Sequence, residues 1–450
     1  MNENNLKSIS PIDGRYRKIS NKISSYFSEY ALIKYRVYVE IEYFKALCDI
    51  PLKQLASISS SDKKKISAIA SKFSLENANR IKKIEQKINH DVKAVEYFIK
   101  EEFDDLGLKN YKEFIHFGLT SQDINNTATP LMLKFCLKNI LLPSLSDVLK
   151  LLKNKSDDFI NISMIARTHG QAASPTTFGK EINVFHERIK NQLNLLYKIP
   201  NNGKFGGASG NLNAHYVSYP SIDWDNFSNK FLERLGLERS KPTTQIEHYD
   251  NMAAIFHNLS RINTILIDFC KDIWHYISIN YLIQKVNKKE IGSSAMPHKI
   301  NPIDFENAEG NLMLANSLYT FFSEKLPISR LQRDLTDSTI SRNIGLPLAY
   351  SKIAFDSIIK GINKLDIGKE TIEKDLNNNW AVVSEAIQTI LRREKISNPY
   401  ELLKDLTRSN DKITKESISK FINDLPINQK IKDELSKIAP KNYIGNSNKK

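Results

Sequence analysis

The sequence contains little cysteine and no long apolar run. Among its 450 residues are three cysteines, Cys48, Cys136 and Cys270, whose spacing fits neither a metal site nor a disulfide framework. We therefore expect reduced thiols, as in the cytosol. No stretch reaches the roughly 20 apolar residues of a membrane span, and the polar first residues contain no apolar signal region. These absences argue against a secreted or membrane protein and predict a cytoplasmic one.

Acidic residues are too few to balance the basic ones. Lysine and arginine number 65 against 51 aspartates and glutamates, which gives a net charge of +14. Binding to nucleic acid is one interpretation of this excess. A composition rich in lysine, asparagine and isoleucine along the whole chain is the other. We favour the second, because the basic residues are dispersed and no patch interleaved with aromatic residues stands out. The positive field would also attract a polyanionic small substrate.

Strand patterns are scarce, and apolar residues recur mostly at helical spacing. We expect an all-α fold with a central bundle of long helices. The clearest helical patterns cover residues 25–48, 79–103, 245–286 and 304–325. Pro130 and Pro143 should kink or interrupt a further long apolar run. An irregular stretch near residue 111 and shorter, more polar helices from about residue 362 predict three domains, residues 1–111, 112–362 and 363–450.

Residues 292–302 combine several groups that could hold an anion. They read Gly-Ser-Ser-Ala-Met-Pro-His-Lys-Ile-Asn-Pro and lie between the last two of these helical patterns. The Gly-Ser-Ser start would leave backbone N–H groups free, Lys299 adds a positive charge, and Pro302 suits the first turn of the next helix. Such a loop can stabilise negative charge that develops in a transition state. A solvated turn is the alternative, and the density of functional groups weakens it.

The pattern Gly-Ser-Ser-x-Met-Pro-x-Lys-x-Asn-Pro at residues 292–302 resembles the signature of the fumarase/aspartase superfamily. Members of that family cleave a C–N or C–O bond by β-elimination and release fumarate, or perform closely related chemistry. The resemblance implies that Ser293 is the base, with Ser294 as the alternative. It makes Lys299 and Asn301 binders of the carboxylate and of the carbanion. Two further positions follow from it: Glu306 would pair with the catalytic histidine, and Asn307 would contact the substrate.

A candidate for that histidine lies in residues 166–171, Ala-Arg-Thr-His-Gly-Gln, between two helical patterns. A histidine followed by glycine at such a junction is a better catalytic candidate than one on a helix face, because glycine lets a ligand come close. The segment matches the family's catalytic histidine segment. We therefore expect His169 to act as the acid and Gln171 to bind substrate, with a purely structural His169 as the alternative.

Two other segments match the family's substrate-contacting blocks. Asn89, His90 and Asp91 lie inside the helical pattern of residues 79–103. A histidine there is more often a surface or core-edge residue, but the resemblance implies that His90 hydrogen-bonds the substrate. Thr120 or Ser121 can cap the helix that follows and leave N–H groups free for an anion. The resemblance makes this Thr-Ser pair the binder of the fumarate-derived carboxylate.

The resemblance also implies a phosphate on the substrate, bound by arginines from two distant parts of the chain. Arg15 and Tyr16 follow Ser-Pro-Ile-Asp-Gly on a loop, and arginine binds phosphate in a bidentate manner. These positions are similar to those of family members whose substrate is a succinylated purine nucleotide. The matching positions later in the chain are Arg333, Ser338 and Arg342, whereas Arg330 fits a solvated basic surface better. Gln245, at the start of a long helical pattern, completes the predicted substrate-binding set.

The resemblance also implies a homotetramer in which three subunits build each active site. We expect no cofactor, because the chemistry needs only acid, base and anion binders. We expect no metal, since His248 and His257 lack a metal-ligand spacing with Glu247 and Asp250. Neither a membrane nor a nucleic acid is an expected partner. Two alternatives stay open: another fumarate-releasing lyase with a non-nucleotide substrate, and a non-enzymatic scaffold or RNA-binding protein.

Overall fold

The computed structural model describes residues 6–285, 296, 299–408 and 413–449. Most of these residues lie in helices, and the strands among them form short two-stranded pairs. The predicted all-α class is therefore confirmed. Contacts divide the chain into two compact units, and the three-domain division stays a prediction. Across the described ranges, no helix is both long enough and apolar enough to cross a membrane.

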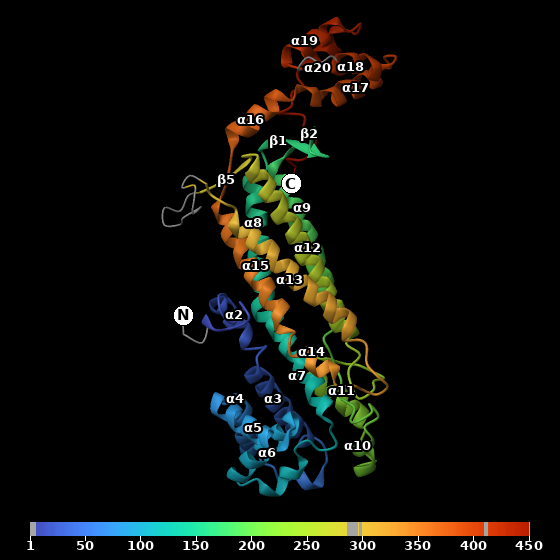
Figure 1. Cartoon of the computed structure of the whole chain (residues 1–450). Coiled ribbons are helices and arrows are strands. Elements are labelled where there is room, and N and C mark those ends of the chain that lie inside the picture. The colour runs from blue at the N-terminus through green and yellow to red at the C-terminus, as the bar shows by residue number, and fades with distance from the viewer. Residues whose placement is uncertain (1–5, 286–295, 297–298, 409–412, 450) are drawn as a thin grey trace. The chain divides into compact units, whose positions relative to one another are not determined.

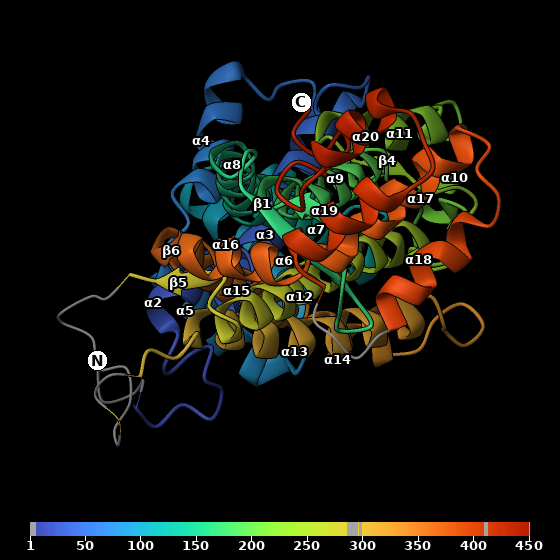
Figure 2. The same ribbon diagram turned by 90° about the horizontal axis from the view of Figure 1, so that it is seen from above.

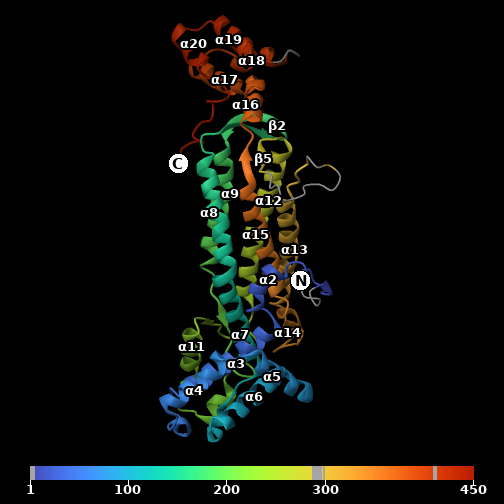
Figure 3. The ribbon, with the colours of Figure 1, turned by 90° about the vertical axis from the view of Figure 1, so that its left-hand side faces the viewer.

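Unit 1 comprises Met1–Leu145, Gln192–Thr264 and Gly310–Asp356. Its early helices α3, α4, α5 and α6 lie side by side (Figures 1 and 3). The elements that lie wholly in this unit are α2 (Arg17–Ser24), α3 (Glu29–Leu47), η1 (Lys53–Leu55), α4 (Ser60–Ser71), α5 (Leu75–Ile88), α6 (Asp91–Asp105), η2 (Lys109–Phe114), α7 (Ser121–Cys136), η3 (Leu137–Leu141), β3 (Asn202–Gly203), α10 (Asn213–Ser218), α11 (Trp224–Arg234), β4 (Glu238–Arg239) and α14 (Thr336–Ser341).

The core of unit 1 joins these early helices to residues far along the chain. The Tyr43 ring lies between the rings of Phe205, Phe227 and Phe231, with centroids 5.2 to 6.1 Å apart. All four side chains are buried, and aromatic pairs at this spacing add to the burial energy. The aromatic cluster therefore fixes α11 and the glycine-rich segment around residue 206 against α3.

Unit 2 comprises Ser146–Asn191, Ile265–Glu309 and Ser357–Lys450. Its late helices α17 to α20 gather in one group (Figure 2) around a small core of their own, which includes Val383, Ile387, Leu391 and Ile418. The elements that lie wholly in this unit are β1 (Ser163–Thr168), β2 (Gln171–Thr177), β5 (Leu282–Gln284), β6 (Leu365–Ile367), α16 (Lys369–Asn378), η4 (Trp380–Val383), α17 (Ser384–Arg393), α18 (Pro399–Arg408), α19 (Lys415–Asp424) and α20 (Gln429–Ser436).

The unit boundaries fall inside long helices, as expected for a helical bundle. These helices are α8 (Leu142–Asp158), α9 (Phe178–Leu196), α12 (Asp250–Ser278), α13 (Ile303–Lys325) and α15 (Gly345–Lys364). The helix predicted at residues 304–325 is thus confirmed as α13. The interruption expected from Pro130 is wrong, because Pro130 lies inside the continuous helix α7. Near Pro143 the helix is interrupted, because the π-helical turn η3 separates α7 from α8 directly before it.

The single helix predicted over residues 79–103 is wrong. Helix α5 ends at Ile88, and Asn89 adopts the left-handed conformation with φ +53°. His90 is extended and becomes the N-cap of α6, where its Nδ1 accepts a hydrogen bond from the backbone N–H of Lys93 at 3.0 Å. Asparagine tolerates the left-handed region better than most residues. Apolar residues keep their helical spacing across the break, so the spacing alone predicts one continuous helix.

The long helix predicted over residues 245–286 is also shorter in the structure. Helix α12 starts at Asp250, directly after Tyr249 with φ +64°, and ends at Ser278, before Asn280 with φ +58°. The chain then forms β5, which pairs antiparallel with β6. Left-handed residues at both ends set the length of the helix.

A β-hairpin replaces the junction between two helical patterns that was predicted around His169. Strands β1 and β2 pair antiparallel, and the register shifts between Ile165 and Arg167. Pro175 and Thr176 belong to β2, and α9 begins only at Phe178. The paired stretch is short and half polar, so its sequence carries little alternation of apolar and polar residues.

Candidate active site

A cavity of about 490 Å³ in unit 1 collects predicted residues from three regions of the chain. The α5–α6 break, the start of α7 and residues around α14 all contribute to its wall. The lining residues that the sequence predicted are Asn89, His90, Asp91, Ser121, Arg333, Ser338 and Arg342. The sequence did not predict the other lining residues, Glu85, Asn125, Leu335, Thr339 and Asn343.

His90 owes its place in the cavity wall to the helix break. Its Nδ1 accepts the Lys93 N–H at 3.0 Å, so the neutral ring carries its proton on Nε2. The side chain is exposed. His90 therefore caps α6 with one ring nitrogen and offers the other to a ligand as a donor.

Asp91 fixes one of the two cavity arginines. Its Oδ2 accepts hydrogen bonds from Arg36 Nη2 at 2.7 Å and from Arg342 Nη2 at 3.0 Å. Burial alone would raise the pKa of Asp91, but the two arginines and the Val92 N–H outweigh it and hold the pKa below its ordinary value. Arg342 also donates to Glu29 at 2.7 Å. The sequence did not predict the contributions of Arg36 and Glu29, which come from α3.

The start of α7 adds a potential anion site to the cavity. Thr120 and Asp123 form a capping box, in which Asp123 Oδ2 accepts the Thr120 N–H at 2.8 Å. The Thr120 cap is thus confirmed, and Ser121 is the first residue of the helix. The helix dipole places partial positive charge at this end. The other Asp123 oxygen accepts a hydrogen bond from Lys204 at 2.7 Å, and both side chains are fully buried.

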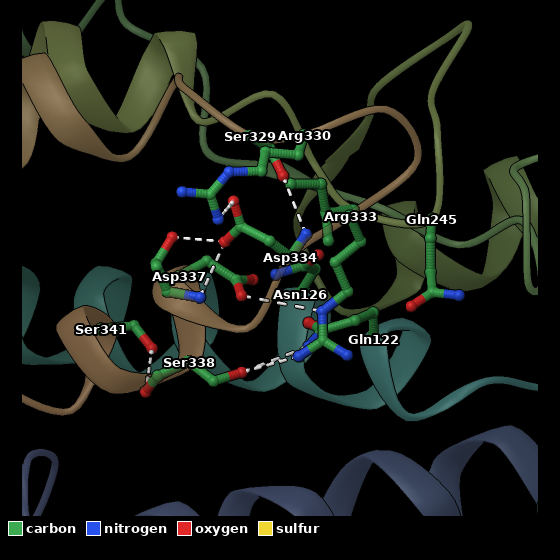
Figure 4. A network of polar contacts seen from close by, with 12 residues as sticks. Gln122, Asn126, Gln245, Ser329, Arg330, Arg333, Asp334, Asp337, Ser338 and Ser341 are labelled. Atoms are coloured by element: carbon green, nitrogen blue, oxygen red, sulfur yellow. Dashed lines mark hydrogen bonds and ion pairs between the residues drawn. The ribbon is translucent and has the colours of Figure 1, made fainter.

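Arg333 lies in a network of polar side chains (Figure 4). Its Nη2 donates to Ser338 Oγ at 2.9 Å, and its Nε lies 3.7 Å from Asp337 Oδ1. Turning the buried Gln122 amide by 180° brings its oxygen to 2.6 Å from Nη2 and 3.2 Å from Nε. Arg333 is therefore held on several sides. Among the residues described, Arg330 pairs only with Asp334, and it is largely exposed, as predicted for a solvated residue.

A buried chain of hydrogen bonds continues behind Asp337. Tyr249 donates its hydroxyl hydrogen to Asp337 Oδ2 at 3.1 Å and accepts a hydrogen bond from Asn126 Nδ2 at 2.6 Å. Asn126 Oδ1 accepts the Glu247 N–H at 2.9 Å. Nearby, Gln245 donates to the carbonyl oxygen of Ala208 at 3.0 Å and is not among the residues that line the cavity. Glu247 is buried and bonded in this network, which gives it a structural role.

His169 lies at the turn of the β1–β2 hairpin in unit 2. His169 and Gly170 both have positive φ, +52° and +76°. The His169 side chain is exposed, and it makes no hydrogen bond or ion pair with any residue that the structure describes. Gln171, also exposed, begins β2. The hairpin thus presents the predicted acid at its tip.

Three residues predicted in or after the signature segment, Lys299, Asn301 and Asn307, also lie in unit 2. Ser293 and Ser294 lie outside the described residues. Lys299 is exposed and Asn301 half-buried. Asn307 Oδ1 accepts a hydrogen bond from Ser357 Oγ at 2.8 Å.

The predicted pairing of Glu306 with His169 is not formed within the chain. Glu306 accepts a hydrogen bond from Trp274 Nε1 at 3.1 Å instead. The two residues lie on separate elements, the start of α13 and the tip of the hairpin.

Arg15 and Tyr16 precede α2 in unit 1, on a turn as predicted. The Arg15 guanidinium carbon lies 5.9 Å from the centre of the Tyr16 ring. Neither residue lines the cavity. Over the described part of the chain, no group of three or more potential metal ligands was found.

The fold of the chain is shared with solved structures of distantly related sequence. It is similar to a fumarate lyase from Mesorhizobium sp. BNC1, with a TM-score of 0.74 and 19% identity over 95% of this chain and 96% of the other. It is also similar to the 3-carboxy-cis,cis-muconate lactonizing enzyme of Pseudomonas putida, with a TM-score of 0.72 and 18% identity over 95% and 94% of the two chains.

Sequence comparison identifies the family of the chain. A family model described as "Lyase" matches residues 14–316, and one described as "Adenylosuccinate lyase C-terminal" matches residues 329–444. Adenylosuccinate lyase of Dictyostelium discoideum is 56% identical over 98% of this chain and 97% of its own length. That of Escherichia coli K12 is 43% identical over 99% and 98%. The chain belongs to the adenylosuccinate lyase family of the fumarase/aspartase superfamily.

Proposed function

We propose that the protein releases fumarate from adenylosuccinate, which gives AMP, and from succinylaminoimidazole carboxamide ribotide in purine nucleotide biosynthesis. The observation that carries this proposal is the cavity of unit 1. Two arginines, a histidine and the start of a helix face one space there, which suits a substrate with both phosphate and carboxylate groups. Family membership supports the same reaction.

In this proposal Ser293 removes the proton from Cβ of the succinyl group. The electron pair of that C–H bond forms the double bond of fumarate, and the bond between Cα and the purine nitrogen breaks. His169 donates a proton to the departing nitrogen. Lys299 and Asn301 stabilise the negative charge that builds up on the adjacent carboxylate. Ser293 must lose its proton first, which the cation and the backbone N–H groups of the signature segment favour.

The remaining predicted residues bind the substrate. Arg333, Ser338 and Arg342 hold the phosphate together with Arg15, and Tyr16 contacts the purine. Thr120 and Ser121 bind the fumarate-derived carboxylate at the start of α7, and His90 donates a hydrogen bond from Nε2. Asn89, Asp91, Gln171, Gln245 and Asn307 complete the binding set. Because Asp91 is bonded to Arg36 and Arg342, it contributes by orienting Arg342.

We further propose a cytoplasmic homotetramer with shared active sites. Met313, Leu314 and Phe321 on α13 are 57%, 51% and 47% exposed in the single chain. Apolar side chains gathered on one helix commonly mark an interface between subunits. Glu306, whose carboxylate does not reach His169 in its own chain, would pair with His169 of another subunit.

The test is to follow the absorbance of the purified protein with adenylosuccinate and to identify AMP and fumarate as products. We expect turnover by the parent and a loss of about a hundredfold or more in His169→Ala and Ser293→Ala. Arg330→Gln serves as the control, because Arg330 is exposed and lies outside the cavity. Fumarate release from argininosuccinate, aspartate or malate, with none from adenylosuccinate, would refute the nucleotide substrate. Absence of lyase activity together with salt-dependent RNA binding would refute the enzyme.

A further inference from the structure

The hairpin that carries His169 is held from both of its strands. In β1, Arg167 Nη2 forms an ion pair of 2.6 Å with Asp375 Oδ2 of α16. In β2, Ser174 Oγ donates to Glu385 of α17, and Thr177 Oγ1 donates to the carbonyl oxygen of Ser447 at 3.0 Å. Helix α16 packs against β1 (Figures 1 and 3). The backbone on each side of the His169 turn is thus fixed by late residues of the chain.

Asp375 makes more contacts than a surface ion pair needs. The Oδ2 atom that binds Arg167 also accepts a hydrogen bond from the hydroxyl of Tyr281, whose side chain is buried. Its Oδ1 accepts a hydrogen bond from Asn379 Nδ2 at 2.8 Å, which fixes the other side of the carboxylate. Tyr281 and Asn379 therefore orient both carboxylate oxygens of Asp375 independently of Arg167. A charged acceptor that is held in this way makes a stronger hydrogen bond to Arg167 than a neutral one would.

Arg167 lies close enough to His169 for its ion pair with Asp375 to fix the position of the hairpin tip. Arg167 is two residues before His169, and only Thr168 separates them. The register of the hairpin shifts between Ile165 and Arg167, so the hydrogen bonds between β1 and β2 hold this part of β1 less firmly. His169 has no hydrogen-bond or ion-pair partner of its own among the residues described. The Arg167–Asp375 ion pair is thus the anchor nearest to the tip.

We propose that Asp375 is a positioning residue for the reaction: it holds the His169 tip in place through Arg167. This inference rests on the proposed role of His169 as the acid. Displacing a catalytic group by about 1 Å can lower the reaction rate by about a hundredfold. The Asp375 carboxylate itself exchanges no proton with substrate in this proposal.

The first test compares Asp375→Asn with Glu373→Gln, two residues away on α16. The Asn side chain keeps the shape but loses the charge, and its amide nitrogen cannot accept, so Arg167 loses its ion pair. Within the described part of the chain, Glu373 makes only a distant contact with Lys441, and both side chains are largely exposed. We expect kcat with adenylosuccinate to fall about tenfold or more in Asp375→Asn while KM changes less than about threefold. Glu373→Gln should match the parent.

The pH profile of kcat separates positioning from an electrostatic effect on His169. A positioning residue lowers kcat at every pH and leaves the inflections where they are in the parent. A displaced inflection in Asp375→Asn would overturn the proposal. Peptides that cover residues 163–177 should also exchange amide hydrogen faster in Asp375→Asn than in Glu373→Gln. Unchanged exchange there would overturn it too.

A double-mutant cycle with His169→Ala shows whether Asp375 acts through His169. If it does, His169→Ala/Asp375→Asn should be within about twofold of His169→Ala alone. A further tenfold loss in the double variant would show a general structural role and overturn the proposal. If His169→Ala alone kept full activity, the proposed acid would be wrong. The exchange experiment would then still report whether Asp375 holds the hairpin.

Discussion

At the scale of the residue, His90 has two roles that one pair of substitutions can separate. Its Nδ1 caps α6, and in the proposed function its Nε2 binds substrate. Asparagine can also cap a helix, whereas alanine cannot. We expect His90→Asn and His90→Ala to lose activity to a similar degree, about tenfold or more. Only His90→Ala should lose stability, by about 1 kcal/mol.

Thermal unfolding and steady-state kinetics of the two variants check this prediction together. If His90→Asn kept the parent's kcat/KM with adenylosuccinate, the ring would have no role in substrate binding. If both variants unfolded at the parent's temperature, the capping role would be wrong.

His116 should make stability depend on pH. Its Nδ1 lies 2.6 Å from Glu40 Oε1, whose side chain is fully buried. Burial lowers the pKa of His116, but Glu40, with Glu96 and Asp123 nearby, outweighs it and raises the pKa above 6.5. The ion pair therefore stabilises the fold fully below pH 6.5, and its contribution is lost as pH rises through the higher pKa of the folded state.

His116→Asn provides the matched control, because His116 has φ +58° and asparagine tolerates that conformation. We expect the parent to be the more stable of the two by about 1.5 to 3 kcal/mol at pH 6. The difference should shrink by pH 9 when unfolding by urea is followed at both values. A difference that grew with pH would contradict the assigned direction of the pKa shift.

At the scale of the element, the buried Asp123–Lys204 pair joins the start of α7 to the glycine-rich segment. Asp123 also accepts the N–H groups of Gly206 and Gly207, at 2.8 and 3.1 Å. Removing one partner leaves an uncompensated charge in the core, which costs about 3 to 5 kcal/mol. We expect that loss in Lys204→Met.

The double variant Asp123→Asn/Lys204→Met should recover part of that loss, because it removes both charges and keeps hydrogen-bonding groups for the two glycines. Unfolding by urea measures the four corners of the cycle. Strict additivity of the two single losses would show that the charges do not interact.

Comparison of the predicted and observed elements shows which of them local sequence patterns can define. Helix α13 and a cap at Thr120 or Ser121 follow from local patterns; the helix at residues 304–325 is confirmed, and the structure makes Thr120 the cap. The break at Asn89 and the ends of α12 depend on single left-handed residues, which do not interrupt the apolar spacing. The β1–β2 hairpin was missed because its strands are short and half polar.

The site was predictable only to the extent that its residues match family motifs. Resemblance pointed to His90, Ser121, Arg333 and Arg342, and these line one cavity. The groups that hold them in place are distant in sequence. Arg36 is 55 residues from Asp91 along the chain, and no local pattern connects such a pair. Only Asp123 carried a local signal, as the fourth residue of the Thr-Ser-Gln-Asp capping box.

At the scale of the whole molecule, the proposed assembly makes a prediction about mixed subunits. His90 lies in unit 1 and His169 in unit 2. If each site takes these two residues from different chains, then His90→Ala and His169→Ala subunits can complement each other in one tetramer. In a random equal mixture, half of the chains supply an intact His90 and half supply an intact His169, so about a quarter of the sites should be complete.

The matched control mixes His90→Ala with Arg342→Ala. His90 and Arg342 line the same cavity within one chain. Each subunit in this mixture lacks one of the two residues, so every cavity is incomplete and the mixture should stay inactive. Each pair would be unfolded, mixed, refolded and assayed, and its mass measured by sedimentation. Activity near a quarter of the parent's in the first mixture alone would demonstrate sites shared between subunits. Equal inactivity of two fully tetrameric mixtures would instead place His90 and His169 in a site built by one chain.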